Sequence, residues 1–171
     1  MKNRCFADLV GDFITEDARA LLRTLGHTSM DAMSRADLRT FQKRYLAQKS
    51  ENERNRSRFL VDRSYADVAA YWLVRDSFDL SVTVQNSFEQ RCQKLASKYD
   101  LHVYFPFGQI PFESDGYRSE DLDFHQQIDL KILELLDRWG VAYMVVQSSD
   151  LEARVQQVLS ETLKYSSKEG V

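Results

Sequence analysis

The chain has 171 residues, with 23 Lys and Arg against 26 Asp and Glu, so its formal net charge is −3. This length suits one domain with a sizeable core. The near balance of charge argues against a general nucleic-acid binder, which would carry a basic field. With 43% hydrophobic residues and only 6 Gly and 2 Pro, the composition excludes low-hydrophobicity disorder and disfavours a many-stranded β-barrel or β-sandwich.

The sequence indicates no targeting or membrane-spanning segment. The stretch from Met1 to Asp8 is too broken by charge for a signal-peptide core, and nowhere do about 18 apolar residues run together. Cys5 and Cys92 have no CxxC partner; they are read as idle thiols in a reducing compartment, with a disulfide between them as the alternative. We therefore expect a cytoplasmic protein in which residues 1–165 form one domain and residues 166–171 a flexible tail.

Short apolar runs alternate with amphipathic patterns along the chain. Strands are predicted at 13–15, 58–62, 101–105 and 141–146. Helices are predicted around 20–22, from 34 to about 56, and around 68–75, 88–99, 124–139 and 155–163. Ser34 with Asp37 and Ser149 with Glu152 resemble capping boxes that open two of these helices, and Gly140 ends another.

This alternation predicts the fold class. Strands that alternate with helices imply parallel pairing through right-handed crossovers, and short apolar strands fit a sheet covered on both faces. The predicted fold is therefore α/β with three layers, a parallel sheet with helices on both faces.

Acidic and basic side chains follow the predicted strands, and ligands of open α/β sheets bind at that end. The groups concerned are Glu16 and Arg19 after the first strand, Asp62, Arg63, Ser64 and Asp67 after the second, and Glu113, Asp115, Tyr117 and Arg118 after the third. Carboxylates that orient a hydroxyl or a magnesium-bound water, beside arginines that neutralise phosphate oxygens, are what phosphoryl transfer needs. The alternative for each residue is a helix cap or a surface ion pair.

Three segments carry a resemblance to a known family. "FITEDARALL", "FLVDRSYADVAAY" and "YFPFGQIPFESDGYRSEDLDFHQQIDLKILELLDRWGVAYMVV" resemble successive motifs of the NadR-type AAA domain family of P-loop kinases and NTPases, over about residues 10–160. The order and spacing of the motifs carry the resemblance, because Asp-Arg after a strand is unspecific alone. It implies an ATP- or GTP-dependent, nucleoside- or nucleotide-kinase-like domain that uses Mg2+.

The resemblance also implies roles for particular residues. Glu16 matches an acidic position near the phosphoryl acceptor. Asp62 and Arg63 match an Asp-Arg pair whose acid is expected near Mg2+ or the acceptor hydroxyl and whose arginine is expected near phosphate. Asp115 and Arg118 match a lid-like segment whose arginine would close over the transferred phosphate. Glu16, Asp62, Arg63 and Arg118 are thus the expected catalytic residues, with Asp62, Asp115 and Arg118 at the cofactor and Mg2+ held through water by Asp62 and Glu16.

The sequence departs from the family at its N-terminal end. The family opens with a strand and a G-x-x-x-x-G-K-[ST] loop, and neither is found in these residues. That loop supplies most of the contacts with the triphosphate and Mg2+, so tight nucleotide binding is not expected without it. In the family strand order 2-3-1-4-5 the first strand is central. Its absence predicts a gap between the strands at 59–62 and 101–105, about 4.8 Å too wide for direct pairing.

Three explanations of this departure remain open: a start site set too far downstream or a truncated product, a degenerate relative kept for binding or regulation, and a fragment without function of its own. They leave two functions. An N-terminally extended form would bind nucleotide and a small-molecule acceptor, whereas a degenerate relative would be a binding or regulatory module. The sequence does not indicate an oligomeric state.

A binding module finds some support in a basic helix. Its bases are Lys43, Arg44, Lys49, Arg54, Arg56 and Arg58, set against Glu51 and Glu53. A solvated helix face explains them, and an acidic lipid or nucleic acid is the alternative partner. Ser64 is not predicted to be a nucleophile, because no histidine is placed in the sequence to activate it. The three histidines have no metal-ligand spacing.

Overall fold

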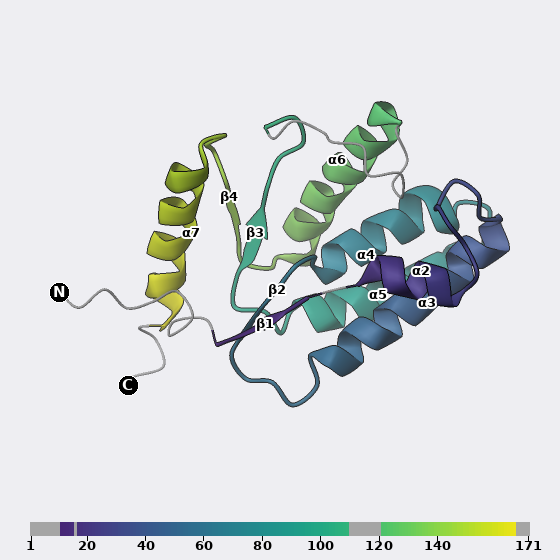
Figure 1. The fold of residues 1–171 in the computed structure, drawn as a ribbon, viewed down its shortest axis with the longest axis horizontal. Coiled ribbons are helices and arrows are strands. Elements are labelled where there is room, and N and C mark those ends of the chain that lie inside the picture. Colours follow the sequence, from purple (N-terminus) through teal and green to yellow (C-terminus); the bar gives the residue numbers. More distant parts are fainter. Residues whose placement is uncertain (1–10, 16, 110–120, 167–171) are drawn as a thin grey trace.

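The computed structural model describes residues 11–15, 17–109 and 121–166, in which helices and short strands alternate (Figure 1). In chain order the elements are β1 (Asp12–Ile14), α2 (Ala18–Thr24), α3 (Arg35–Asn52), β2 (Phe59–Val61), α4 (Tyr65–Tyr71), the π-helical turn η1 (Trp72–Asp76), α5 (Val82–Ala96), β3 (His102–Tyr104), α6 (Leu122–Trp139), β4 (Tyr143–Val145) and α7 (Leu151–Ser166). The predicted α/β class and all four predicted strand positions are confirmed, although each strand has only three residues.

The strands pair in parallel, as the alternation with helices predicts. Asp12, Phe13 and Ile14 of β1 lie opposite Phe59, Leu60 and Val61 of β2. In the same way, β3 lies in parallel beside β4, with His102 opposite Tyr143 and Tyr104 opposite Val145. Helices between paired strands supply the crossover connections that parallel pairing requires.

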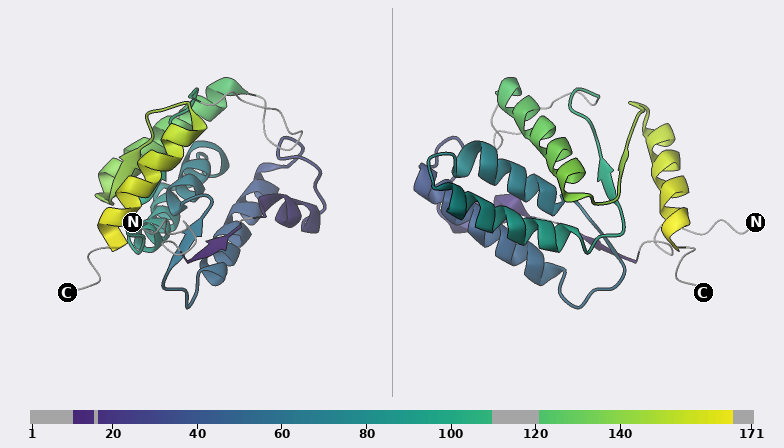
Figure 2. Two further views of the ribbon diagram at one scale, coloured as in Figure 1. Left: turned by 60° about the vertical axis from the view of Figure 1, so that its left-hand side comes forward. Right: turned by 180° about the vertical axis from the view of Figure 1, so that it is seen from behind.

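The four strands form two ladders. Within the described residues, β1 pairs with β2 and β3 with β4, but no ladder joins β2 to β3. Figure 1 shows the four strands in the spatial order β1, β2, β3, β4, with their directions turning progressively from one to the next. The turned views show α7 beside β4 at one end of the molecule and α2 with α3 at the other (Figure 2). The separation of β2 from β3 falls where the resemblance predicts a missing strand.

Helix α4 connects the two ladders through the core. Tyr65, Ala66, Val68, Ala69 and Ala70 are all at most 1% exposed. This helix has its most extensive contacts with α6 and α5. The three alanines allow neighbouring helices to approach closely, while the larger side chains fill the remaining space. Because α4 begins directly after β2, its burial also sets the position of the residues that end this strand.

The helix after β2 does not stay α-helical to its end. It passes at Trp72 into η1, and Ser77 closes this turn by donating from its backbone nitrogen and its hydroxyl to the Trp72 carbonyl, at 2.9 and 2.8 Å. A π turn inserts one residue and so rotates the side chains that follow. The sequence pattern predicts one regular helix here.

Two predicted helix signals are confirmed and one is wrong. Ser34 and Asp37 form the expected capping box, and Gly140 ends α6 in the left-handed conformation with φ 63°. Ser149 does not cap α7. Asp150 instead accepts the backbone N–H of Ala153 at 2.9 Å. Asp150 immediately precedes the first helical residue, so its carboxylate reaches the third amide of the helix, whereas Ser149 lies one residue too early.

A buried ion pair lies near the end of α3. The Lys49 ammonium is 2.9 Å from Glu53 Oε1, with side chains 0% and 9% exposed. The hydroxyls of Tyr65 and Tyr99 donate to Glu53 at 2.7 Å each. The prediction of a wholly solvated basic face is therefore wrong at Lys49, because two tyrosines and one carboxylate supply the partners that make its burial tolerable.

None of the helices in the described part of the chain combines the length and apolarity that a membrane span needs.

The Glu53 cluster yields a stability prediction. Changing Glu53→Gln leaves the buried Lys49 charge without its counter-charge, so the free energy of unfolding should fall by about 3–5 kcal/mol. Glu51→Gln is the matched control on the same helix, because Glu51 pairs with Arg54 where the two side chains are 62% and 67% exposed. That change should cost less than about 1 kcal/mol. Urea denaturation measures both, and equal effects would contradict the role of the cluster.

Candidate functional site

The end of β2 is shaped by the cap of α4. Ser64 Oγ accepts the backbone N–H of Ala66 at 2.8 Å, and the Ser64 backbone N–H donates to Asp67 Oδ2 at 2.8 Å. The other carboxylate oxygen of Asp67 accepts a hydrogen bond from the Arg63 guanidinium at 3.1 Å. Asp67 is thus fully engaged in holding the turn. Its place three residues after Ser64 is the capping-box spacing.

Arg63 has an unusual backbone conformation. Its φ is 74°, in the left-handed region that side chains other than Gly, Asn and Asp rarely adopt. The Asp67 carboxylate raises the pKa of Arg63, which keeps the guanidinium charged. Such strain persists only where the surroundings hold it, and it concentrates at functional sites. The turn therefore fixes where Arg63 and its neighbour Asp62 point.

Asp62 is the one carboxylate of this turn that is available to a ligand. Its side chain is exposed, and it makes no hydrogen bond or ion pair with the part of the chain that the structure describes. Unlike the Asp67 carboxylate, the Asp62 carboxylate takes no part in capping α4. Asp62 can therefore accept a hydrogen bond from a hydroxyl or from a metal-bound water.

A cavity of about 410 Å3 opens beside this turn, between α2, α3, α4 and α6. That volume suits a small molecule. Its lining combines three carboxylates and three arginines with aromatic, amide, imidazole and aliphatic groups: Asp17, Asp62, Asp67, Arg19, Arg63, Arg75, Phe41, Tyr45, Tyr71, Phe124, Gln42, His125, Ala18, Leu22, Met30 and Val68. Charged groups above an aromatic wall are suited to a ligand with both a planar ring and polar or anionic substituents.

Arg75 is a cation of this cavity that contacts two aromatic rings and one carboxylate. Its guanidinium lies 5.1 Å from the centre of the Tyr71 ring and 5.9 Å from that of Phe124. Its Nε donates to Asp76, a carboxylate that is fully buried. Burial raises the pKa of Asp76. The π turn of η1 places these two residues, one facing the cavity and the other facing the core.

The described residues can contribute to a magnesium site but do not complete one. They contain no group of three or more His, Cys, Asp or Glu side chains that could hold a metal ion. Mg2+ is commonly bound by one or two carboxylates together with substrate phosphates and water. Asp62 fits that pattern as a single carboxylate ligand, acting directly or through water, with phosphate oxygens as the other ligands.

The structure brings part of the predicted site together. Asp62 and Arg63 line one cavity together with Arg19, which also follows a predicted strand. Glu16, Asp115 and Arg118 lie outside the described residues. Sequence reasoning missed Tyr71, Arg75 and Phe124 because it searched only after strands. The spacing of Tyr71 and Arg75, four residues apart in a helix, was the available signal.

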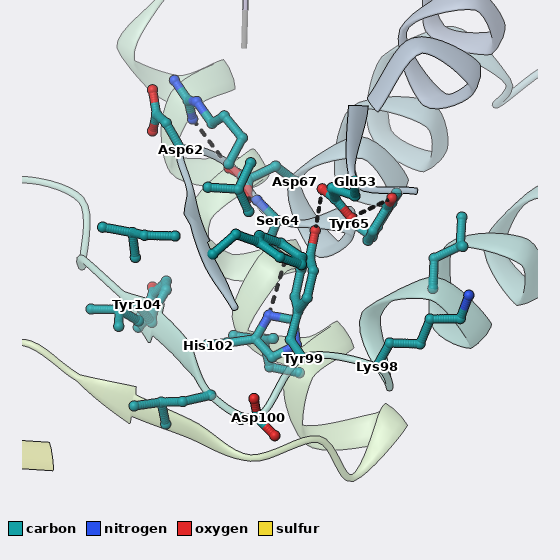
Figure 3. Close-up of a pocket in the computed structure, with 18 of the residues that line it drawn as sticks. Glu53, Asp62, Ser64, Tyr65, Asp67, Lys98, Tyr99, Asp100, His102 and Tyr104 are labelled. Carbon is teal, nitrogen blue, oxygen red and sulfur yellow. Dashed lines mark hydrogen bonds and ion pairs between the residues drawn. The ribbon is translucent and has the colours of Figure 1, made fainter. Parts of the chain in front are cut away.

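A histidine lies beside Ser64, contrary to the sequence prediction. His102 Nδ1 is 3.1 Å from Ser64 Oγ, and its Nε2 is 3.2 Å from the Ala96 carbonyl (Figure 3). The tautomer that satisfies both contacts carries its proton on Nε2 and accepts the Ser64 hydroxyl proton at Nδ1. Because Ser64 Oγ also caps α4, this bond connects β3 to the start of α4.

Arg63 gives a prediction that isolates backbone strain. Arg63→Gly and Arg63→Ala both remove the ion pair with Asp67, but only Gly adopts φ 74° without penalty. The Gly variant should therefore be more stable than the Ala variant by about 1–2 kcal/mol. Chemical denaturation of both variants measures the difference, and an Ala variant as stable as the Gly variant would refute the left-handed conformation.

His102 gives a prediction about pH. Burial lowers its pKa below 6.5 in the folded protein, so below pH 6.5 the unfolded chain binds the proton more readily than the folded chain. The free energy of unfolding should therefore fall as the pH drops below 6.5, by at most about 1.4 kcal/mol per pH unit. His102→Gln should remove this contribution and His125→Gln should leave it. Urea denaturation of both variants at pH 7.5 and 5.5 measures how much the free energy of unfolding changes with pH. The same change in both variants would argue against a contribution from His102.

Comparison with known proteins identifies the family. A family model described as an AAA domain matches residues 7–154. No curated protein matches the chain, and no solved structure does. The match covers most of the 171 residues and includes both ladders, the Asp62–Arg63 turn and the cavity. The chain therefore belongs to this AAA domain family, which points to a P-loop-like, nucleotide-binding NTPase or kinase-like domain.

Proposed function

We propose that this domain serves ATP- or GTP-dependent phosphoryl transfer to a small, nucleoside-like acceptor bound in the 410 Å3 cavity. One observation carries the proposal: the Asp62 carboxylate, which has no ion pair among the described residues, lines a cavity that also contains arginines and aromatic rings, beside the left-handed Arg63. Membership of the AAA domain family supports the reaction class, and the lining of the cavity supports it as the acceptor's place.

Each group has a role in this proposal. Asp62 orients the acceptor hydroxyl by accepting its hydrogen bond, or contacts Mg2+ through water. Arg63 and Arg19 neutralise phosphate oxygens as they approach that hydroxyl. Arg75, with Tyr71 and Phe124, holds the planar part of the acceptor against the aromatic wall. These assignments give the polar chemistry to Asp62, Arg63 and Arg19 and the recognition of a ring to Arg75, Tyr71 and Phe124.

The nucleotide side of the reaction rests on the family. We propose that Glu16 lies near the acceptor and that Asp115 and Arg118 close over the transferred phosphate, as their family positions imply. We further propose that the two ladders belong to one three-layered sheet with helices on both faces. The sequence printed here has no G-x-x-x-x-G-K-[ST] loop, so we expect weak nucleotide binding and little catalysis from these residues alone.

A second function, that of a binding module, is favoured by the separation of β2 from β3, which form no ladder with each other within the described residues. The space between the ladders adjoins the acceptor cavity, since Asp62, Arg63, Asp67, Tyr71 and His125 line both.

Ligand binding to the cavity tests the proposal. Adenosine, guanosine, thymidine and their 5′-monophosphates would be screened by saturation-transfer NMR, and the strongest ligand titrated by calorimetry. We expect at least one nucleoside to bind. Asp62→Asn should weaken that binding about tenfold or more, because a hydrogen bond to a charged acceptor is lost. As Asp62 is exposed, the change should leave stability unaltered.

Asp100→Asn is the matched control. Asp100 is also an exposed carboxylate, but it lines the larger cavity between the ladders and not the acceptor cavity. The Asp100→Asn variant should bind the chosen nucleoside with the same affinity as the unchanged protein. A folded protein that binds none of the six compounds, or equal weakening by both variants, would refute the acceptor site.

A further inference from the structure

Helix α3 buries an amide side chain among largely apolar ones. Gln42 is 3% exposed, and its buried neighbours on the same helix include Leu38, Phe41, Tyr45 and Leu46. A leucine or a methionine would fill this position without the desolvation cost that a polar amide carries. Packing alone therefore does not explain why an amide lies here.

One hydrogen bond fixes which way the amide of Gln42 points. Its Nε2 donates to the Val68 carbonyl at 2.7 Å. That carbonyl also accepts the backbone N–H of Trp72 within its own helix, so it does not depend on Gln42 for a partner. Because the oxygen and nitrogen of an amide point in different directions, the Gln42 nitrogen faces α4 and the oxygen faces away from it.

The oxygen of Gln42 is available to a ligand. Within the described part of the chain, Oε1 accepts no hydrogen bond. It is not sealed in the interior either, because the buried side-chain atoms that lack a partner among the described residues are Trp72 Nε1 and Arg154 Nε. Gln42 lines the acceptor cavity of about 410 Å3. Its oxygen therefore opens into that cavity.

A charged donor belongs to the same cavity. Asp76 accepts hydrogen bonds from Nε and Nη2 of Arg75 at 2.5 and 3.4 Å. The third nitrogen of the guanidinium, Nη1, donates no hydrogen bond to the residues that the structure describes. The Arg75 side chain is 20% exposed and lines the cavity. The cavity thus offers a hydrogen-bond acceptor at Gln42 and a donor at Arg75.

This combination favours a ring with hydrogen-bonding groups on its edge. A plain aromatic ring would leave the Gln42 oxygen desolvated and unpaired, which costs about 1–3 kcal/mol. A nucleobase carries N–H donors together with carbonyl or ring-nitrogen acceptors on its edge. It can therefore supply a donor for Gln42 and an acceptor for Arg75, while its face packs against the aromatic rings of the cavity.

We propose that Gln42 is a specificity-determining residue of the acceptor cavity, and that its Oε1 accepts an N–H from the edge of a nucleobase. The inference rests on the proposed function, because it requires the acceptor to bind in this cavity. It goes further by naming the part of the acceptor that the protein distinguishes, which is the edge of the base. A nucleoside without that N–H is rejected because its binding leaves a buried oxygen unpaired.

Nucleosides that differ in this N–H test the inference on the unchanged protein. Calorimetry compares the strongest-binding nucleoside with an analogue that lacks the edge donor. The analogue is purine riboside for adenosine or guanosine, and N3-methylthymidine for thymidine. The nucleoside should bind at least tenfold more tightly than its analogue. Equal affinities of the unchanged protein for the two compounds would overturn the inference.

The Gln42→Met variant shows whether the preference comes from this residue. Methionine has a similar length and no amide, and the Val68 carbonyl keeps its Trp72 partner, so the variant should fold, as circular dichroism checks. It should bind nucleoside and analogue with affinities within about twofold of each other, because the bond needs both the N–H and Oε1. Gln48→Met is the matched control. Gln48 is exposed on the same helix and does not line the cavity, so this variant should keep the tenfold preference.

The outcomes separate this inference from the proposed function. If no nucleoside binds the folded protein, the acceptor site fails and the role of Gln42 fails with it. If nucleosides bind and Asp62→Asn weakens them, but Gln42→Met keeps the preference for the N–H, the acceptor site stands and the role of Gln42 is refuted. Equal weakening of both compounds by Gln42→Met would show that Gln42 only supports the packing of α3 against α4.

Discussion

The arrangement of this protein depends on the burial of one short helix. Helix α4 follows β2 directly and packs against α5 and α6, and the hydrogen bond from Ser64 to His102 connects its start to β3. Two ladders of three-residue strands have little stability alone, because isolated two-stranded units are marginal in water. The small side chains of Ala66, Ala69 and Ala70 let α4 serve as the common core on which both ladders are held.

The same helix connects stability with the candidate site. Its N-terminal cap uses Ser64 and Asp67 and holds Arg63 in the left-handed region. The Asp62 carboxylate, in contrast, has no hydrogen bond or ion pair with the described residues. One carboxylate therefore stabilises the fold while its neighbour remains available for chemistry. The two cavities meet at this turn, because Asp62, Arg63 and Asp67 line both. The smaller cavity adds Arg75 and Phe124, which suit a small molecule with a planar ring.

The fold was predictable to the extent that its signals are local. Alternating apolar runs located all four strands, and Ser34 with Asp37 located the start of α3, because periodicity and capping act within a few residues. Of the candidate site, the Asp62–Arg63 turn was predictable from the rule that ligands bind after strands. Arg75, Tyr71 and Phe124 were not, since they come from two helices whose approach depends on packing and on a π turn.

The sequence by itself determined the α/β class, the parallel pairing, the polar turn after β2 and the resemblance to the AAA domain family, because all of these are written in short-range patterns and their order. Only the tertiary structure decided which charges are buried and which are available. Lys49 belongs to a helix that looks solvated, yet two tyrosines from other elements bury it with Glu53. It also decided that β2 and β3 face each other without pairing, because strand neighbours are set by long-range contacts that no local pattern encodes.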